Sequence, residues 1–274
     1  MSDWDAERYH RLSDPQLSWG RRVLARLGPI PGERILDVGC GSGRLTVEIL
    51  LTMGRGSVVG VDPSAAMLTQ AAGRSAEPVA GPHDVTQPPG RVHFVRADGA
   101  ELPFAGAFDA VFSTAAFHWM PDHAQLFASI YCALAPGGRL VAQCGGGPNL
   151  DRLLTRAHRL MERPQYRAWF EDWGDPWYFA DVPGTRMRLE AAGFTMANVS
   201  LEPAPTPLPD AEAYAEFLSG VCVRHHVARL PEPLQPAFLA ALTSDAAADD
   251  PPFTLDYWRL NISAVKPAGA EQAA

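Results

Sequence analysis

The sequence predicts an α/β protein built on a doubly wound, mostly parallel sheet of seven strands. Short apolar runs, of which 35–38 and 57–62 are the first two, alternate with longer amphipathic stretches. This alternation is typical of parallel strands joined by helices. Acids stand at the carboxyl ends of these two runs (Asp37 and Asp62), and the first run leads directly into the glycine loop 39–43. Because open parallel sheets bind ligands at this edge, we expect a nucleotide-type pocket there.

The bulk composition is that of an ordinary globular chain. It has 274 residues, of which 47% are hydrophobic and 20% charged, enough for one large domain with insertions. A formal net charge of -8 disfavours a nucleic-acid partner. Neither a signal peptide nor a membrane-spanning run is recognisable, so we expect a cytoplasmic protein without a membrane partner. Four widely spaced cysteines form no C-x-x-C motif and are expected to be reduced and buried: Cys40, Cys132, Cys144 and Cys222.

The spacing of the glycine loop decides between nucleotide classes. A dinucleotide fingerprint needs G-x-G-x-x-G, but the sixth position is Arg44 counted from Gly39 and Thr46 counted from Gly41. The loop instead reads Asp-x-Gly-x-Gly-x-Gly. Asp62 lies 19 residues after Gly43, where its carboxylate can accept both hydroxyls of a ribose. The alternative for Asp62 is a cap of the helix that follows it.

Three further strands are predicted before residue 145. The run 91–97 ends at Asp98, which either accepts the exocyclic amine of an adenine or serves as a turn residue. A long surface loop, 73–90, precedes it. The run 108–113 is the fourth strand, and the helix 122–135 leads to the fifth strand at 139–144.

Five stretches together fall in the order and spacing of a known family: 35–43, 61–68, 97–104, 108–119 and 134–142. They resemble the class I S-adenosylmethionine (SAM) methyltransferases, which have a Rossmann-like fold. The stretch 116–123, with Trp4, Asp5 and Tyr9, looks like the trans-aconitate methyltransferase group and its small-molecule methyltransferase relatives. The resemblance implies an enzyme that binds S-adenosyl-L-methionine and a small-molecule acceptor. The cofactor-binding residues expected from it are Asp37, Gly39, Gly41, Gly43, Asp62, Met67, Asp98, Gly99 and Ser113.

The second half of the chain predicts additions to this core. Residues 31–147 form the cofactor-binding core, 1–30 a helical cover, 148–183 and 207–250 helical caps over the substrate, 184–206 and 251–266 the last strands, and 267–274 a disordered tail. Three glycines, 145–147, predict a flexible connection to the first cap. The final strand is expected to be antiparallel and to lie at the edge of the sheet.

Candidate acceptor residues lie after the fourth strand and in an aromatic block. His118 is the candidate catalytic residue, either as a general base or as a hydrogen-bonding and shaping group. The block 166–179 contains 7 aromatic residues and is either a lobe core or a lid over the acceptor. Arginines on 150–163 form a solvated stripe or anchor a second carboxylate. The pair His225-His226 has no acid or cysteine at ligand spacing, so no metal site is predicted. The substrate contacts expected are Phe117, Trp119, Trp173 and Trp177.

Three functions fit these features. The aromatic block favours methyl transfer to an apolar or aromatic secondary metabolite. The family resemblance supports a carboxyl O-methyltransferase of a trans-aconitate-like acid. A cyclase or binding protein that holds SAM without transferring methyl is the third, because cofactor motifs report binding rather than turnover.

Overall fold

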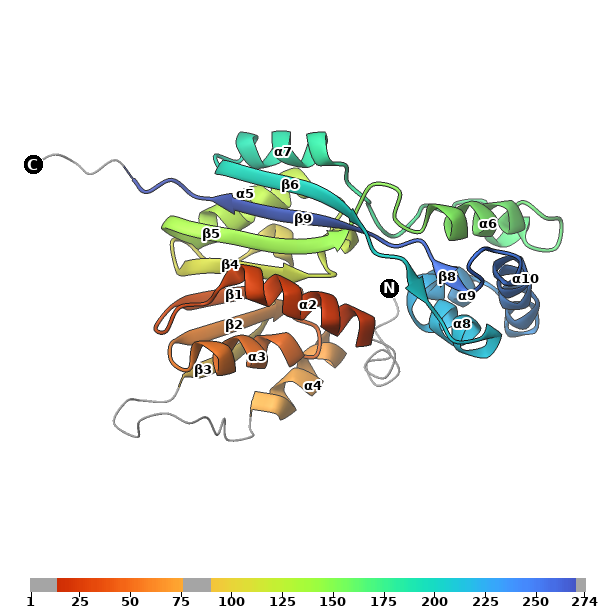
Figure 1. Ribbon diagram of the computed structural model, residues 1–274, viewed down its shortest axis with the longest axis horizontal. Helices are drawn as coiled ribbons and strands as arrows, with labels where there is room; N and C mark the ends of the chain where they lie inside the picture. The colour runs from red at the N-terminus through yellow and green to blue at the C-terminus, as the bar shows by residue number, and fades with distance from the viewer. Residues whose placement is uncertain (1–13, 76–89, 270–274) are drawn as a thin grey trace, which may run out of the picture.

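A computed structural model describes residues 14–75 and 90–269, and it confirms the predicted fold class (Figure 1). One seven-stranded sheet has the order β3-β2-β1-β4-β5-β9-β6. The first five strands in this order (β3, β2, β1, β4 and β5) pair in parallel, and β9 runs antiparallel to both of its neighbours. The strand bounds are β1 Arg34–Val38, β2 Ser57–Asp62, β3 Arg91–Arg96, β4 Phe108–Thr114, β5 Leu134–Gly145, β6 Thr195–Pro203 and β9 Trp258–Val265.

The last strand is antiparallel as predicted, but its expected place at the edge is wrong. Strand β9 lies between β5 and β6, and β6 forms the edge. A polar ladder crosses these three strands, because Gln143 Nε2 donates to Asn261 Oδ1 (2.7 Å) and Asn261 Nδ2 donates to Glu202 Oε2 (3.3 Å). The polar residues of β9 give it the sequence pattern of a half-exposed edge strand. In the folded chain, Asn261 instead pairs with polar side chains of β5 and β6.

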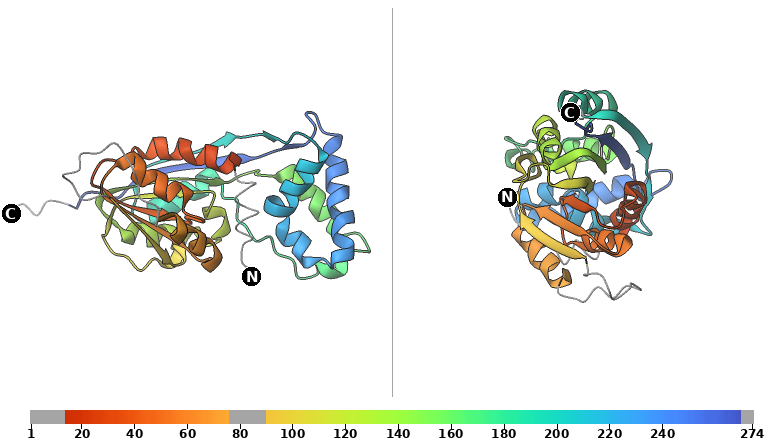
Figure 2. Two further views of the ribbon diagram at one scale, coloured as in Figure 1. Left: turned by 90° about the horizontal axis from the view of Figure 1, so that it is seen from below. Right: turned by 90° about the vertical axis from the view of Figure 1, so that its left-hand side faces the viewer.

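Helices cover both faces of the sheet (Figures 1 and 2). Helices α2 (Asp14–Leu27), α3 (Arg44–Met53) and α4 (Ala65–Ser75) lie on one face, and α5 (His123–Ala133) and α7 (Val182–Ala191) lie on the other. Each face has its own buried apolar cluster. In the described ranges no helix has the length and apolar character that crossing a membrane requires.

Helix α3 shows how the sequence sets an element beside the site. Gly43 precedes it with a φ of 74°, a left-handed conformation that glycine adopts at little cost. The buried positions Thr46, Ile49, Leu50 and Met53 follow helical spacing and face the sheet. The helix ends at Gly54, whose N–H donates to Leu50 O.

A second group of helices forms a lobe beyond the carboxyl ends of the parallel strands (Figures 1 and 2). Its members share one buried cluster of aliphatic and aromatic side chains. The lobe contains α6 (Asp151–Met161), α8 (Ala211–Phe217), α9 (Arg224–Arg229), α10 (Gln235–Ala247) and the short pair β7 (Thr206–Pro207) and β8 (Thr254–Leu255). The single-turn elements of the chain are η1 Gly99–Glu101, η2 Phe117–Trp119, η3 Arg167–Trp169, η4 Leu218–Cys222 and η5 Glu232–Leu234.

The arginines of α6 are bound within the lobe. The guanidinium of Arg156 makes two bonds to the carboxylate of Asp249 (2.8 and 2.6 Å), and Arg152 Nε lies 3.5 Å from the same group. Both expectations for these two residues, a solvated stripe and an acceptor anchor, are therefore wrong. Arg159 and Arg163 are exposed.

The aromatic block divides between the two predicted roles. Tyr166 and Phe170 are buried in the lobe, where both rings lie against Phe238. Trp177 and Phe179 instead line a pocket at the edge of the sheet. Part of the block is therefore lobe core, and part faces the pocket.

The three glycines 145–147 are closely packed, which contradicts their interpretation as a flexible linker. All three N–H groups donate: Gly145 to His118 Nδ1 (3.3 Å), Gly146 to Trp258 O (3.3 Å) and Gly147 to Ala180 O (2.9 Å). A Cβ on Gly146 would lie 2.6 Å from Leu260 Cβ. Glycine is needed here because the chains approach closely.

Two remaining expectations concern surface features. All four cysteines are free, but only Cys144 and Cys222 are buried; Cys40 is half-buried and Cys132 is exposed, so the expectation of burial is wrong for Cys132. Trp4, Asp5 and Tyr9, most of the predicted loop 73–90, and residues 270–274 of the predicted tail lie outside the described residues.

Candidate active site

In the glycine loop after β1, neighbouring atoms pack closely against the first and last glycines, whereas the space beside the central glycine is empty. The N–H groups of Gly39 and Cys40 both donate to Val61 O, at 2.8 and 3.0 Å. A Cβ on Gly39 would collide with Ala116, and one on Gly43 would lie 2.6 Å from Phe94 Cζ. A Cβ on Gly41 would meet no atom within 4 Å. The loop therefore leaves room for a ligand at its central glycine.

Two aspartates form hydrogen bonds at or next to this loop. Asp37 is buried and accepts a hydrogen bond from Thr46 Oγ1 (2.7 Å), which links β1 to the first turn of α3. Burial raises the pKa of Asp37 to about 7, although the Thr46 bond opposes this shift. Asp62 is half-buried, and its carboxylate accepts from the N–H groups of Gly41 and Ser64, both at 2.9 Å. It stands at the open side of the loop, and its predicted bond to a ribose stays a prediction.

Helix α4 is capped by Ser64 and not by Asp62, the alternative role considered for that aspartate. Ser64 Oγ accepts from the N–H of Met67 at 3.2 Å, so Ser64 caps the first turn of α4. Met67 itself is buried in that turn.

The remaining expected cofactor residues lie at the ends of β3 and β4. Asp98 is exposed and accepts from Ala100 N–H (2.9 Å), so it caps η1. Gly99 is buried, and an added Cβ would lie 2.9 Å from Val38 Cγ1. Ser113 Oγ donates to Val38 O at 2.7 Å, which ties β4 to β1. Gly99 and Ser113 contact Val38, the last residue of β1 before the glycine loop, and the cofactor contacts predicted for all three residues stay predictions.

The open Gly41 and the carboxylate at the end of β2 fit an adenosyl ligand. A carboxylate at that position can accept from ribose hydroxyls, and the missing Cβ allows the ligand to approach the backbone. The geometry is therefore compatible with the predicted contacts of Asp62 and Gly41 with SAM, which stay predictions.

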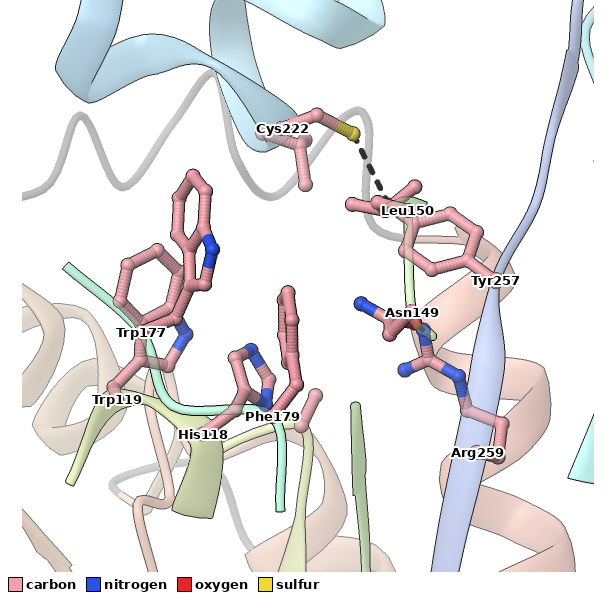
Figure 3. A pocket seen from close by; sticks show the side chains of 11 residues that line it. His118, Trp119, Asn149, Leu150, Trp177, Phe179, Cys222, Tyr257 and Arg259 are labelled. Atoms are coloured by element: carbon pink, nitrogen blue, oxygen red, sulfur yellow. Dashed lines mark hydrogen bonds between the residues drawn. The ribbon is translucent and has the colours of Figure 1, made fainter. Parts of the chain in front are cut away.

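A second pocket lies between this edge of the sheet and the helical lobe (Figure 3). Of the predicted acceptor residues, His118, Trp119 and Trp177 line it. Neither Phe117 nor Trp173 lines it, because Phe117 is fully buried in the sheet core against Phe127 and Trp173 lies in the lobe against His226. The structure therefore does not support their predicted contact with the acceptor. The lining that the sequence analysis missed is Ala115, Asn149, Leu150, Phe179, Val221, Cys222, Tyr257 and Arg259.

His118 is held as a neutral hydrogen-bond donor. Its Nδ1 accepts from Gly145 N–H at 3.3 Å, so the proton of the neutral ring sits on Nε2. Burial, together with the charge of Arg259, lowers the pKa of His118 to about 3. The ring is therefore a poor base at neutral pH, and the general-base interpretation is not supported; the hydrogen-bonding alternative is.

Arg259 brings a buried positive charge to the pocket. It is only 4% exposed, and its guanidinium stacks on the rings of Trp19 (4.1 Å) and Tyr257 (4.5 Å). One guanidinium nitrogen donates to Asn149 Oδ1 at 3.1 Å, and the same oxygen accepts from Trp258 N–H at 2.9 Å. The only signal in the sequence was an arginine within the apolar final strand.

Comparisons with known proteins agree with this geometry. Residues 35–138 match the family described as "Methyltransferase domain". The chain is 31% identical to trans-aconitate 2-methyltransferase of Rhodopseudomonas palustris (strain BisB18), over 97% of this chain and 100% of the relative. It is 32% identical to the protein of the same name from Variovorax paradoxus (strain S110), over 88% and 87%.

Solved structures share the fold at lower identity. Phosphoethanolamine N-methyltransferase 2 of Haemonchus contortus, solved with S-adenosyl-L-methionine, superposes with a TM-score of 0.60 at 20% identity. That match covers 96% of this chain and 56% of the other. The cyclase SpnF gives a TM-score of 0.58 at 20% identity, with coverage of 92% and 81%. The sheet order, the glycine loop and these relatives show that the chain belongs to the class I S-adenosylmethionine-dependent methyltransferases.

Proposed function

We propose that this enzyme methylates a carboxylate group of a small polycarboxylic acid. The observation that carries the proposal is the buried guanidinium of Arg259 in the same pocket as the Nε2–H of His118. A guanidinium and a neutral N–H donor are groups that bind carboxylate oxygens. The relatives named trans-aconitate 2-methyltransferase, whose name denotes such an acid, support the same substrate class.

The chemistry of the acceptor agrees with the state of His118. When bound, SAM supplies an electrophilic methyl group on a sulfonium. A carboxylate has lost its proton at neutral pH and needs no general base. The residues of this chain therefore have to bind and orient the acceptor and exclude water. Such positioning can lower a barrier by about 7–11 kcal/mol.

The positive charge of Arg259 affects the pKa values of titratable groups in and beside the pocket. Burial raises the pKa of Cys144 and of Cys222 to about 12 each, while the Arg259 charge acts on both in the opposite direction. It also contributes to the low pKa of His118. A pocket that favours negative charge selects an anionic acceptor over a neutral one.

A second candidate is an aromatic acceptor, supported by the pocket wall. The rings of Trp177 and Phe179 lie 19° from parallel with centroids 5.9 Å apart, and they present a flat apolar surface. We rank this function second because it gives Arg259 no role. The non-methylating alternative has the support of one fold neighbour, the cyclase SpnF, at an identity that carries fold alone.

A methyl-transfer assay tests the proposal. Purified protein with methyl-labelled SAM should methylate trans-aconitate or related tricarboxylic acids in preference to neutral aromatic acceptors. Arg259→Met should raise the acceptor KM by about 30-fold or more, since truncating one partner of a buried charge pair costs about 2–5 kcal/mol. The affinity for SAM should stay within about twofold.

The matched control is Arg21→Met, which removes an exposed arginine paired with Glu48 on the surface. It should leave the KM unchanged. Preferential turnover of neutral aromatic acceptors, or an unchanged KM in Arg259→Met, would contradict the proposal. Tight SAM binding with no labelled product from either acceptor class would favour the non-methylating alternative.

A further inference from the structure

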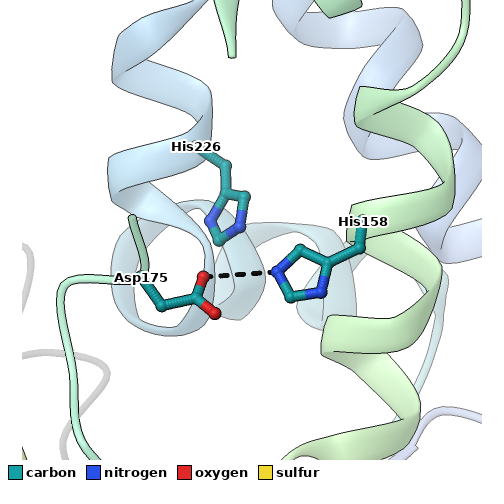
Figure 4. A group of neighbouring side chains, drawn as sticks. All are labelled: His158, Asp175 and His226. Carbon is teal, nitrogen blue, oxygen red and sulfur yellow. Dashed lines mark hydrogen bonds and ion pairs between the residues drawn. The ribbon is translucent and has the colours of Figure 1, made fainter. Parts of the chain in front are cut away.

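Three ligand-type side chains from separate elements meet inside the helical lobe (Figure 4). His158 comes from α6, His226 from α9, and Asp175 from the segment between η3 and α7. One candidate ligand atom from each lies within 4.8 Å of the other two. His158 Nε2 and Asp175 Oδ1 are 3.3 Å apart. The three residues are far apart in the sequence, so the spacing of residues around His226 does not indicate this group.

His226 is the member that needs a partner. Its side chain is completely buried, and neither ring nitrogen has a hydrogen-bond partner. The ring packs against Trp173, with centroids 4.4 Å apart, and points toward the other two residues in Figure 4. A buried polar group without a partner is costly, and a bound ion would satisfy one of the two ring nitrogens.

Two imidazoles and one carboxylate are a ligand set that Zn²⁺ takes, with water in the fourth position. Ligand atoms of a tetrahedral zinc ion lie about 3.3 Å apart, which follows from bond lengths of about 2.0–2.1 Å. The His158–Asp175 distance already has this value. The other two pairs of candidate ligand atoms lie within 4.8 Å and would have to approach to about 3.3 Å when the ion binds.

The surroundings provide support for the ligands and access for the ion. Trp173 Nε1–H donates to Asp175 Oδ1 at 3.0 Å and so orients the carboxylate, as outer-shell groups do in metal sites. A surface hollow lined by His158 and Asp175 also contains two acids, Glu162 and Glu171, and one base, Arg167. The ion could therefore enter from solvent past further acidic groups.

We propose that His158, Asp175 and His226 bind a Zn²⁺ ion that fastens α6, α9 and the segment around Asp175 to one another. This site lies outside the methyl-transfer pocket, and its role is to hold the lobe. Asp175 is two residues from Trp177, and the neighbour of His226 is His225, whose ring is 5.5 Å from that of Trp119. The ion would thus also steady one wall of the acceptor pocket.

Zinc titration of the chelator-treated, tag-free protein tests this proposal. Calorimetry should show one equivalent bound. Saturation should raise the midpoint of thermal unfolding by about 5 °C, as expected for a ligand that binds only the folded chain. Replacement of Zn²⁺ by Co²⁺ should give the visible absorption of a tetrahedral nitrogen and oxygen site.

Substitutions of the two exposed ligands, His158 and Asp175, are the informative ones. His226 belongs to the lobe core, so its substitution could also disturb folding. His158→Ala and Asp175→Asn should each weaken zinc binding by more than about 100-fold, since even outer-shell losses cost about 10–100-fold. His93→Ala is the matched control, because His93 is an exposed histidine on β3. Unchanged SAM binding will show that the variants are folded. Absence of zinc binding to the wild-type chain, or equal binding by the two ligand variants and the control, would overturn the proposal.

Discussion

At the level of single residues, His118 combines a tautomer set by Gly145 N–H with a pKa of about 3 that burial imposes. We expect His118→Gln to retain activity within about tenfold, because a glutamine amide can also donate to the acceptor. His118→Leu should lower kcat/KM by about 10–150-fold, the loss of one hydrogen bond to a charged group of about 1.5–3 kcal/mol. Steady-state kinetics of both variants measure this difference.

The pH profile separates this role from general-base catalysis. With a pKa of about 3, His118 stays neutral from pH 5.5 to 8, so kcat/KM should show no inflection near 6.5 from this ring. A general base with an ordinary pKa would give a decline below pH 6.5 in the wild type that disappears in His118→Gln. Such a decline would contradict the donor role.

Residues of the cofactor edge were predictable because their signal is contiguous. The loop 39–43 carries its spacing within a few positions, and Asp62 ends the next strand. The acceptor pocket joins His118, Asn149 and Arg259, which are far apart in the chain. No local pattern connects them, and only the register of β9 in the sheet brings Arg259 close to His118.

At the level of elements, the packed glycines at the end of β5 provide a stability prediction. Gly146→Ala should destabilise the protein by about 1–3 kcal/mol, because the new Cβ would lie 2.6 Å from Leu260 Cβ and 2.8 Å from Ala180 O. The control is Gly73→Ala in α4, where an added Cβ meets nothing within 4 Å. It should stabilise by about 0.5–1 kcal/mol, since alanine is the better helix former.

Urea unfolding of both variants checks this comparison. If Gly146→Ala is as stable as the wild type, the contacts at Gly146 are not restrictive, and the flexible interpretation of 145–147 regains support.

The strands show which features of an element can be predicted from its own residues. Strand β2 has the predicted bounds, whereas the place of β9 depended on side-chain pairing with β5 and β6 that only the folded chain reveals.

At the level of the whole molecule, buried and half-buried histidines make the free energy of unfolding depend on pH. Burial lowers the pKa of four of them, to about 3 for His118, to about 4 for His225 and His226, and below the ordinary value for His123. In the unfolded chain these rings bind protons near pH 6.5. The unfolded state therefore binds more protons below that pH, and stability is lost as the pH falls from about 6.5 toward 4.

The pKa shift of Asp37 has the opposite effect on the pH dependence of stability, but it involves a single group. Its pKa is raised to about 7 in the folded state, so its contribution favours folding as the pH falls below 7. The paired carboxylates of Glu33, Asp109 and Asp249 have lowered pKa values and lose their contribution only in more acidic solution. In the window from pH 6.5 to 5 the histidines should therefore dominate.

Urea unfolding at pH 7.5, 6.0 and 5.0, with a chelator present so that metal binding does not contribute, measures this dependence. We expect the free energy of unfolding to fall by at least about 1.4 kcal/mol per pH unit below 6.5, which corresponds to one net proton. His225→Gln should reduce the slope, because its ring is one of those that protonate on unfolding. A stability that is constant or rises toward pH 5 would show that these rings can be protonated inside the folded chain, and that the lobe around His226 opens to water.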